Sequence, residues 1–304
     1  MNLSSENYQL SLNTLKPSIN NYRWMIKLLR ARAQKMGYFP ARTYQILQRF
    51  CSPARPYFIG TTKSGVKFLG DYRDEYSLSW EVLDSYDDDL MRFLEQQTHR
   101  QKGLYLDVGC NIGIISSALS QWLGREGEVW SFEPLPETVK RACATFALNR
   151  VENVSLFPIA LGAENGTLDI YSTPGHSESV SAVGGNAEGA VAVSVKCMTL
   201  DTLFSEKKPA FSNLGLIKID VEGYELSVLR GAKDTLSQRK PDVFYEFNPP
   251  MLRAAQCGPE DLSDFFGEIG SYQQEVLEND GKWSSFPPDA SRSDYVNVYC
   301  HLSL

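Results

Sequence analysis

Hydrophobic and polar positions follow two different periods along the chain, and their order predicts an α/β fold. From residue 103 onward, short apolar runs typical of buried strands alternate with segments whose apolar residues recur at helical spacing. The predicted strands are 104–108, 128–132, 154–161, 214–219 and 243–247, and the predicted helices are 112–123, 137–148 and 225–238. This alternation favours a parallel sheet with helices on both faces.

Weaker strand patterns occur between and after these predicted elements. Two β-like runs, 167–171 and 190–196, flank the Gly- and Ser-rich segment 172–189. That segment is too long for a simple turn, and we expect a mobile loop over a site. The C-terminal part predicts one helix and two closing strands, at 260–266, 274–277 and 295–300.

The first hundred residues have a different pattern. They predict two helices with basic faces, a hairpin around Lys63-Ser64-Gly65, and a third helix, at 22–35, 44–50, 57–61 with 66–69, and 83–97. Because these elements precede the strand–helix alternation, we expect a cap region over residues 1–100 and a second domain over residues 101–304.

Charge separates the same two parts of the chain. The net charge is −7 over 304 residues, yet Asn7–Gly70, the basic arm, holds eleven Lys and Arg residues and no Asp or Glu. We expect the arm to dock on an acidic surface of its own chain or of a homo-oligomer, with an anionic membrane surface or a phosphate-bearing acceptor as alternatives. Nucleic acid is the least favoured partner, because no recognised nucleic-acid-binding module accompanies the charge.

Composition narrows the class of protein. A hydrophobic content of 42% is typical of a soluble globular chain, and no apolar run approaches the ~20 residues of a membrane span. Since the first residues lack the order of a secretory signal, we expect a cytoplasmic protein. The six cysteines show no paired spacing, which predicts buried free thiols.

A glycine turn follows the first strand of the alternation. A dinucleotide-binding turn has the pattern Gly-x-Gly-x-x-Gly. With Gly109 as the first glycine, Asn111 and Ile114 replace the second and third, which argues against binding of a pyrophosphate. The turn offers close backbone approach at Gly109 and Gly113, the Asp107 carboxylate, and amides at a helix start that favour a ligand carboxylate. These features suit an amino-acid-bearing cofactor such as S-adenosylmethionine.

The second predicted strand ends at Phe132-Glu133-Pro134. A carboxylate in the place of Glu133 can accept both hydroxyls of an unphosphorylated ribose. The structural alternative is a residue that caps the following helix.

Four blocks together resemble the FkbM family of S-adenosylmethionine-dependent methyltransferases. They are Asp107-Val108-Gly109-Cys110-Asn111-Ile112-Gly113, Phe132-Glu133-Pro134, Ile159-Ala160-Leu161-Gly162 and Lys218-Ile219-Asp220-Val221-Glu222-Gly223-Tyr224-Glu225. The resemblance implies a Rossmann-like, seven-stranded mixed sheet over the domain 101–304. It also implies methylation of a hydroxyl, commonly on a sugar, a glycan or a natural-product small molecule.

The resemblance further implies which residues hold the cofactor. The methionine half would contact Asp107, Gly109, Asn111 and Gly113, the ribose Glu133, and the adenine Pro134 and Ala160. Asp220 would face the methyl group.

Four residues are candidates for the transfer step: Asp220, Lys218, Glu246 and His176. Lys218 and Asp220 share one face of a strand because side chains alternate, and an ion pair between them is the structural alternative. Glu246 ends the next strand and is a second candidate base, while His176, in the glycine-rich segment, is a third or else a solvated loop residue. Asp220, Glu222 and Glu246 could bind a divalent cation, but no ligand spacing demands one, and we predict no metal.

Two other functions compete with methyl transfer. A nicotinamide-dependent sugar oxidoreductase is disfavoured by the broken glycine fingerprint and by the lack of a Tyr-x-x-x-Lys pair after the third or fourth strand. The other is a membrane-surface or scaffold protein that kept a cofactor fold, which liposome binding without cofactor affinity would favour.

Overall fold

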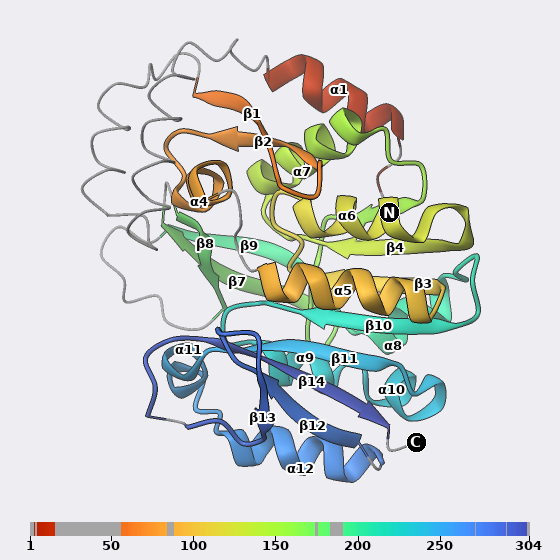
Figure 1. The fold of residues 1–304 in the computed structure, drawn as a ribbon, viewed down its shortest axis with the longest axis vertical. Helices are drawn as coiled ribbons and strands as arrows, with labels where there is room; N and C mark the ends of the chain where they lie inside the picture. Colours follow the sequence, from red (N-terminus) through yellow and green to blue (C-terminus); the bar gives the residue numbers. More distant parts are fainter. Residues whose placement is uncertain are drawn as a thin grey trace.

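A mixed sheet of eight strands runs through the computed structural model of the chain (Figure 1). Its order is β13-β12-β14-β11-β10-β3-β4-β5, in which the five strands from β11 to β5 are parallel and the other three antiparallel. The strands are β3 (Gly103–Val108), β4 (Gly127–Phe132), β5 (Val154–Phe157), β10 (Leu214–Ile219), β11 (Asp242–Phe247), β12 (Tyr272–Leu277), β13 (Trp283–Ser285) and β14 (Val296–Leu302). The predicted Rossmann-like mixed sheet is confirmed. It has an eighth strand, β13, which is only three exposed residues long and shows no strand pattern in the sequence.

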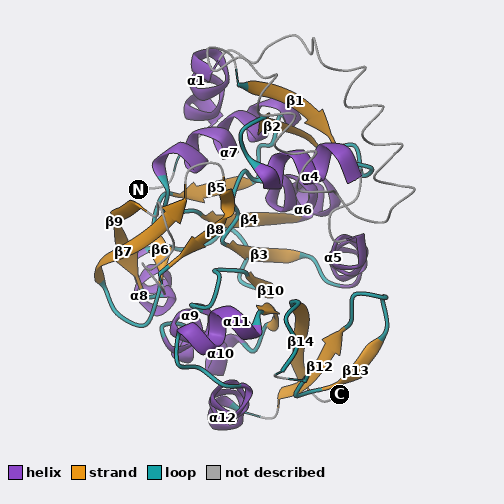
Figure 2. Ribbon diagram, turned by 90° about the vertical axis from the view of Figure 1, so that its left-hand side faces the viewer, coloured by secondary structure: helices purple, strands orange, loops and turns teal. Residues whose placement is uncertain are grey.

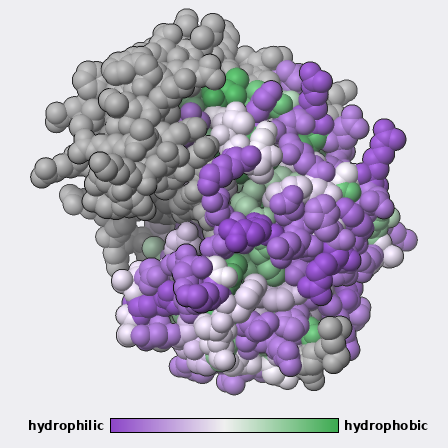
Figure 3. All heavy atoms as spheres, viewed as in Figure 1, coloured by the Kyte–Doolittle hydropathy of each residue, from purple (hydrophilic) through white to green (hydrophobic). Residues whose placement is uncertain are grey.

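The structure describes residues 3, 5–15, 56–83, 88–173, 176–182, 191–270, 272–289 and 291–302. The helices predicted at 22–35 and 44–50, and most of the basic arm, lie outside the described residues. Among the helices that are described, none is long and apolar enough to cross a membrane. On the face seen in Figure 3, the described surface is mostly hydrophilic with small hydrophobic areas.

Helices cover both faces of the central sheet (Figure 2). One face carries α5 (Asp88–Arg100), α6 (Ile114–Leu123) and α7 (Pro136–Asn149), and the other α8 (Leu200–Glu206), α9 (Glu225–Arg230), α10 (Lys233–Arg239), α11 (Pro249–Ala254) and α12 (Pro259–Ile269). Side chains along β3 alternate between the two faces of the sheet. Tyr105 therefore packs in the apolar cluster on one face, and Leu104 and Leu106 pack in the cluster on the other. The five described cysteines are buried with free thiols, as predicted.

A second sheet, of order β6-β9-β7-β8, corrects two predictions. Its strands are β6 (Ala160–Leu161), β7 (Gly166–Thr173), β8 (His176–Ser181) and β9 (Val191–Met198). The strand predicted at 154–161 is broken at Pro158, which has no amide to donate, so β5 and β6 pair in different sheets. The loop predicted at 172–189 is wrong over its first part, because backbone pairing orders residues of β7 and β8 that show no strand pattern.

The remaining differences between the predicted and the observed elements concern helices. The helix predicted at 225–238 is two helices, α9 and α10, because the chain between them packs on another backbone: a Cβ at Gly231 would lie 1.9 Å from the Gly162 carbonyl oxygen. The helix predicted at 83–97 begins later, at Asp88, and ends at Arg100. Sequence patterning missed α8 and α11 altogether.

The N-terminal elements rest on α7. Helix α1 (Ser5–Leu15) was not predicted; its buried Tyr8 ring meets Phe146 at 5.2 Å, and the Tyr8 hydroxyl donates to the Val154 carbonyl at 3.0 Å. The predicted hairpin is present as β1 (Tyr57–Thr61) and β2 (Lys67–Asp71), followed by the unpredicted α4 (Glu75–Leu83). Arg141 of α7 binds Asp74, at the start of α4, through a buried ion pair of 2.8 Å. This pair fixes α4 against the sheet domain.

We expect Thr199→Ala to lower the free energy of unfolding by about 1 kcal/mol, the usual cost of losing a helix N-cap. The Thr199 hydroxyl oxygen accepts from the Thr202 amide at 3.0 Å and caps α8. Urea unfolding measures the change. Ser205→Ala, which removes an exposed hydroxyl near the other end of the same helix, is the matched control, and equal midpoints for the two variants would contradict the capping role.

Candidate active site

A cavity opens where the carboxyl ends of the central parallel strands meet. Its floor comes from residues that follow β3, β4 and β10, and from Glu246 near the end of β11. Walls come from α4, α5 and the second sheet, with Trp80, Met91 and Ile170 among the lining side chains. Open α/β sheets bind ligands at this edge, where crossovers run to opposite faces.

Backbone hydrogen bonds and close packing within the protein fix the glycine turn after β3. Gly109 has φ +80°, and a Cβ there would lie 1.8 Å from the Asp220 carbonyl oxygen, so only glycine fits. The amides of Gly109 and Cys110 both donate to the Phe132 carbonyl, at 3.0 and 2.9 Å, and the Gly113 amide donates to the Cys110 carbonyl. These three amides are therefore satisfied within the protein. The expectation that amides at the start of the helix, α6, favour a ligand carboxylate stays a prediction.

Glu133 joins the turn to the start of α7. Its two carboxylate oxygens accept from the Asn111 amide at 3.2 Å and the Leu135 amide at 2.9 Å. Burial raises the pKa of Glu133 to about 7, and these two amide bonds oppose the shift. Because a carboxylate has about four lone-pair positions, Glu133 keeps acceptor capacity toward the cavity that it lines. The N-cap of α7 is Leu135, so the alternative that Glu133 caps this helix is wrong.

Lys218 stands at the centre of a buried ion cluster. Its Nζ lies 3.4 Å from Asp107 Oδ1, 3.1 Å from Asp220 Oδ2 and 3.4 Å from the Gly109 carbonyl oxygen. Burial alone would lower the pKa of Lys218, but the Asp220 and Asp107 carboxylates outweigh it and raise that pKa above its usual value. Lys218 is therefore a permanent cation that orients Asp220, and it is not a base.

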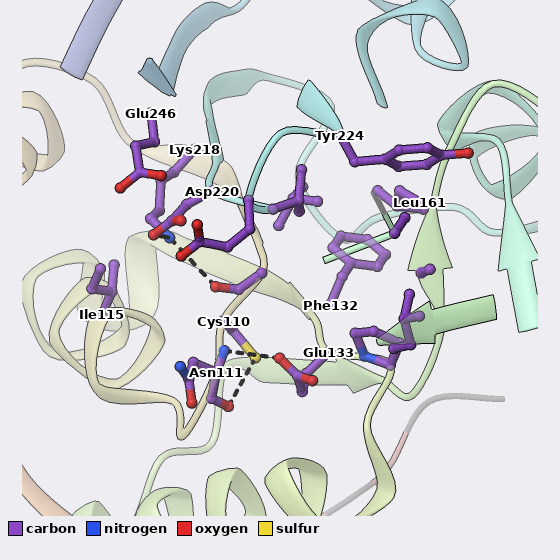
Figure 4. A pocket seen from close by; sticks show the side chains of 18 of the residues that line it. Cys110, Asn111, Ile115, Phe132, Glu133, Leu161, Lys218, Asp220, Tyr224 and Glu246 are labelled. Atoms are coloured by element: carbon purple, nitrogen blue, oxygen red, sulfur yellow. Dashed lines mark hydrogen bonds and ion pairs between the residues drawn. The ribbon is translucent and has the colours of Figure 1, made fainter. Parts of the chain in front are cut away.

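Glu246 completes an acidic group with Asp220 and Glu222. One carboxylate oxygen from each of the three lies within 4.8 Å of the others, a geometry that could hold a metal ion. Glu246 Oε2 is buried without a hydrogen-bond partner. Burial, then the charges of Asp220 and Glu222, raise the pKa of Glu246 well above its usual value. Figure 4 shows Glu246, Lys218 and Asp220 together on one side and Glu133 on the other.

Residues 107–293 match the family described as Methyltransferase FkbM domain. The chain belongs to the FkbM methyltransferase family. This confirms the predicted family and removes the nicotinamide-dependent oxidoreductase as a candidate.

Two curated relatives of the chain are methyltransferases. The 2-O-methyltransferase NoeI of Sinorhizobium fredii is 26% identical over 168 residues, which cover 50% of this chain and 65% of the relative. The hexuronic acid methyltransferase AglP of Haloferax volcanii is 28% identical over 158 residues, 52% of this chain and 61% of the relative. The chain thus matches less than two thirds of the length of either relative.

Solved structures with a similar fold include a methyltransferase FkbM from Methylobacillus flagellatus, with a TM-score of 0.41 and 15% identity over 73% of this chain and 52% of that one. Another is the O-methyltransferase TomG from Streptomyces achromogenes, with a TM-score of 0.42 and 13% identity over 76% of this chain and 88% of that one.

The cavity of this FkbM chain gathers most of the residues singled out in the sequence. They are Gly109, Asn111, Glu133, Pro134, Ala160, Lys218, Asp220 and Glu246. His176 begins β8 and pairs with Thr173, so it is a strand residue and not a loop residue; only its backbone is described.

Two residues that were expected to bind the cofactor do not line the cavity but lie behind its wall. Asp107 is fully buried, and its carboxylate accepts from Ser116 Oγ at 2.5 Å and pairs with Lys218. Gly113 packs on Phe146, where a Cβ would lie 2.6 Å from the ring. Both residues shape the site without reaching its surface.

Sequence reasoning missed several lining residues. Tyr76 and Trp80 belong to α4, which no pattern predicted, and Asn297 lies on β14 far along the chain. Tyr224 stands in the block 218–225 that carries the family resemblance but had no role assigned, and its ring lies against the chain at Gly162. Only Tyr224 carried a sequence signal that could have identified it.

Proposed function

We propose that the chain is an S-adenosylmethionine-dependent O-methyltransferase that acts on a hydroxyl of a sugar, a glycan or a natural-product small molecule. The observation that carries the proposal is one cavity with Glu133 on one side and the Lys218-held Asp220 on the other. Membership of the FkbM family supports it, as does the activity named for the relative NoeI.

The residues present fit the cofactor. Glu133 has the acceptor capacity that two ribose hydroxyls require, and Pro134, Ala160 and Leu161 offer an apolar surface for an adenine ring. Gly109, whose carbonyl accepts from Lys218, and Asn111, whose amide donates to Glu133, also line the cavity and would hold the methionine half. When bound, S-adenosylmethionine supplies an electrophilic methyl group on a positively charged sulfur.

Asp220 is the proposed base for the acceptor hydroxyl. Methyl transfer is an in-line displacement with a neutral leaving group, so the protein mainly aligns the acceptor oxygen and removes its proton. Asp220 reaches the cavity with a side chain that is 36% exposed, while the buried Lys218 fixes its orientation. Glu246 lines the same cavity, and its carboxyl group is the second candidate to contact the acceptor hydroxyl.

Calorimetric titration with S-adenosylmethionine and with NADH tests the proposed function. We expect S-adenosylmethionine to bind and NADH not to bind, because the turn after β3 lacks the glycines that admit a pyrophosphate. Binding of NADH in place of S-adenosylmethionine would overturn the proposal.

Glu133→Ala should weaken S-adenosylmethionine binding by about 1 to 3 kcal/mol, the size of lost hydrogen bonds to a charged group. The Kd from calorimetry measures the loss. Glu137→Ala, which removes an exposed carboxylate on α7, is the control and should leave the Kd unchanged. A folded Glu133→Ala protein with the wild-type Kd would remove Glu133 from the ribose site.

A further inference from the structure

The turn between β10 and α9 forms part of the cavity wall. It spans residues 220–224 and is called the acid turn here, because it carries Asp220 and Glu222. Every residue of the acid turn except Gly223 lines the cavity. Asp220 is the proposed base, and Figure 4 shows it beside Lys218. The position of the Asp220 carboxylate therefore depends on the conformation of the acid turn.

The backbone of the acid turn adopts an unfavourable conformation. Glu222 has φ +54° and Gly223 has φ +95°, and a residue with a side chain, such as Glu222, rarely occupies this region. Gly223 also passes so close to α11 that a Cβ there would lie 2.8 Å from the Met251 carbonyl oxygen. A conformation of this kind persists only where its surroundings hold it. The contacts that hold the turn therefore set the geometry of this part of the site.

Glu225 holds one end of the acid turn. It is the first residue of α9 and is fully buried, and its Oε1 accepts from the Val221 amide at 3.1 Å and from the Gly223 amide at 3.2 Å. At the other end of the turn, the Asp220 amide donates to the Val108 carbonyl at 3.0 Å. The backbone of β3 thus fixes one end, and a single side-chain oxygen fixes the other.

The hold that Glu225 exerts does not depend on its charge. Burial raises the pKa of Glu225 to about 7, the amide bonds oppose the shift, and the charge of Asp220 adds to it. Oε1 can accept two hydrogen bonds either as a carboxylate oxygen or as the carbonyl oxygen of the protonated group. The acid turn therefore needs one oxygen acceptor at this place and not a negative charge.

We propose that Glu225 is a positioning residue for methyl transfer and acts through Asp220. The inference rests on the proposed function and adds a residue to it. Glu225 is not among the described residues that line the cavity, so it acts without touching the acceptor. Its Oε1 fixes the amide that follows Asp220 and the amide that follows Glu222, which keeps the Asp220 carboxylate at 3.1 Å from Lys218 Nζ. Without this acceptor the turn relaxes, and a displacement of about 1 Å in a reacting group costs on the order of 10²-fold in rate.

Two substitutions at one position test the inference. Glu225→Met keeps the length and the helix propensity of the side chain but removes the acceptor, whereas Glu225→Gln keeps an oxygen that can take the place of Oε1. We expect Glu225→Met to lower kcat by about 10- to 100-fold with a Kd for S-adenosylmethionine close to that of the wild type, and Glu225→Gln to recover most of the rate. Initial rates with methyl glucoside, methyl galactoside and methyl mannoside measure kcat, and calorimetry measures the Kd. Glu260→Met, which changes an exposed glutamate in the first turn of α12, is the control and should leave both unchanged.

The same substitution in an Asp220→Asn protein separates positioning from stability. If Glu225 acts through Asp220, Glu225→Met costs much less in kcat there than in the wild type, because the group that it positions has already lost its function. A residue that only stabilises the fold costs the same factor in both proteins.

Hydrogen exchange at the acid turn supplies a readout that needs no acceptor. Glu225→Met should speed exchange of the Val221 and Gly223 amides, because both lose their hydrogen-bond acceptor, and Glu225→Gln should leave exchange close to that of the wild type. If Glu225→Met does not fold, Glu225→Asp takes its place, because its shorter side chain cannot keep both bonds.

Each contrary outcome is distinct. A wild-type kcat in Glu225→Met overturns the inference, and so does an equal loss with and without Asp220→Asn, or an equal loss in the Met and Gln variants. If S-adenosylmethionine binds and none of the glycosides is methylated, exchange decides: unchanged exchange in Glu225→Met overturns the inference, and faster exchange confined to the acid turn and reversed in Glu225→Gln supports it. If S-adenosylmethionine does not bind the wild type, the proposed function fails as well; any of the other failures removes only this inference.

Discussion

Asp220→Asn is expected to lower kcat by about 10² to 10⁴-fold, the range of a lost general base. The substitution keeps the shape of the side chain and a hydrogen bond to Lys218 Nζ, so the Kd for S-adenosylmethionine should stay close to that of the wild type. The measurement is the initial rate of methyl transfer to whichever glycoside the wild type methylates, together with calorimetry for the cofactor.

The control for this variant is Asp264→Asn, which changes an exposed acid on α12 and should leave the rate unchanged. Glu246→Gln and His176→Ala are the parallel variants for the two other candidate bases. The variant that loses turnover while keeping cofactor affinity identifies the base. Near-normal rates in all three would mean that the proton leaves to water and that the enzyme works by aligning oxygen and methyl group.

Lys218→Met is expected to lower the free energy of unfolding by about 3 to 5 kcal/mol, the cost of removing one partner from a buried ion pair. Asp107 is fully buried and would keep Ser116 as its hydrogen-bond partner but lose its counter-cation. The Asp220 carboxylate, 36% exposed, would lose less from the missing cation, because water reaches it. Guanidinium unfolding measures the change.

Lys233→Met supplies the matched control for the buried cluster. Its ammonium pairs with Glu268 at 2.9 Å, but both side chains are more than half exposed, and surface pairs of this kind contribute about 0 to 1 kcal/mol. A double variant, Asp107→Asn with Lys218→Met, should recover part of the loss because the unpaired charge is gone. Equal losses in the two single Lys variants would show that the buried cluster does not stabilise the fold.

The sequence by itself determined the central sheet and the ends of its strands. Apolar runs and helical periods are local properties, and they identified the strands that carry Glu133, Asp220 and Glu246. The carboxyl ends of parallel strands meet at one edge, so acids at these ends lie near one another, and all three line the cavity. The shared face of Lys218 and Asp220 followed from alternation alone, and the ion pair is present at 3.1 Å.

Tertiary structure decided what surrounds these acids. The register of β3 against β10 sets Asp107 opposite Lys218, and that pairing, which no local pattern encodes, moves Asp107 behind the cavity. Asp74, at the start of α4, pairs with Arg141 of α7, and no local pattern encodes such a contact between distant segments, so Tyr76 and Trp80 could not be placed from sequence. The raised pKa of Glu246 depends on burial and on two neighbouring acids from other segments. Contacts between distant segments set these properties, and a single sequence records the residues but not which of them meet.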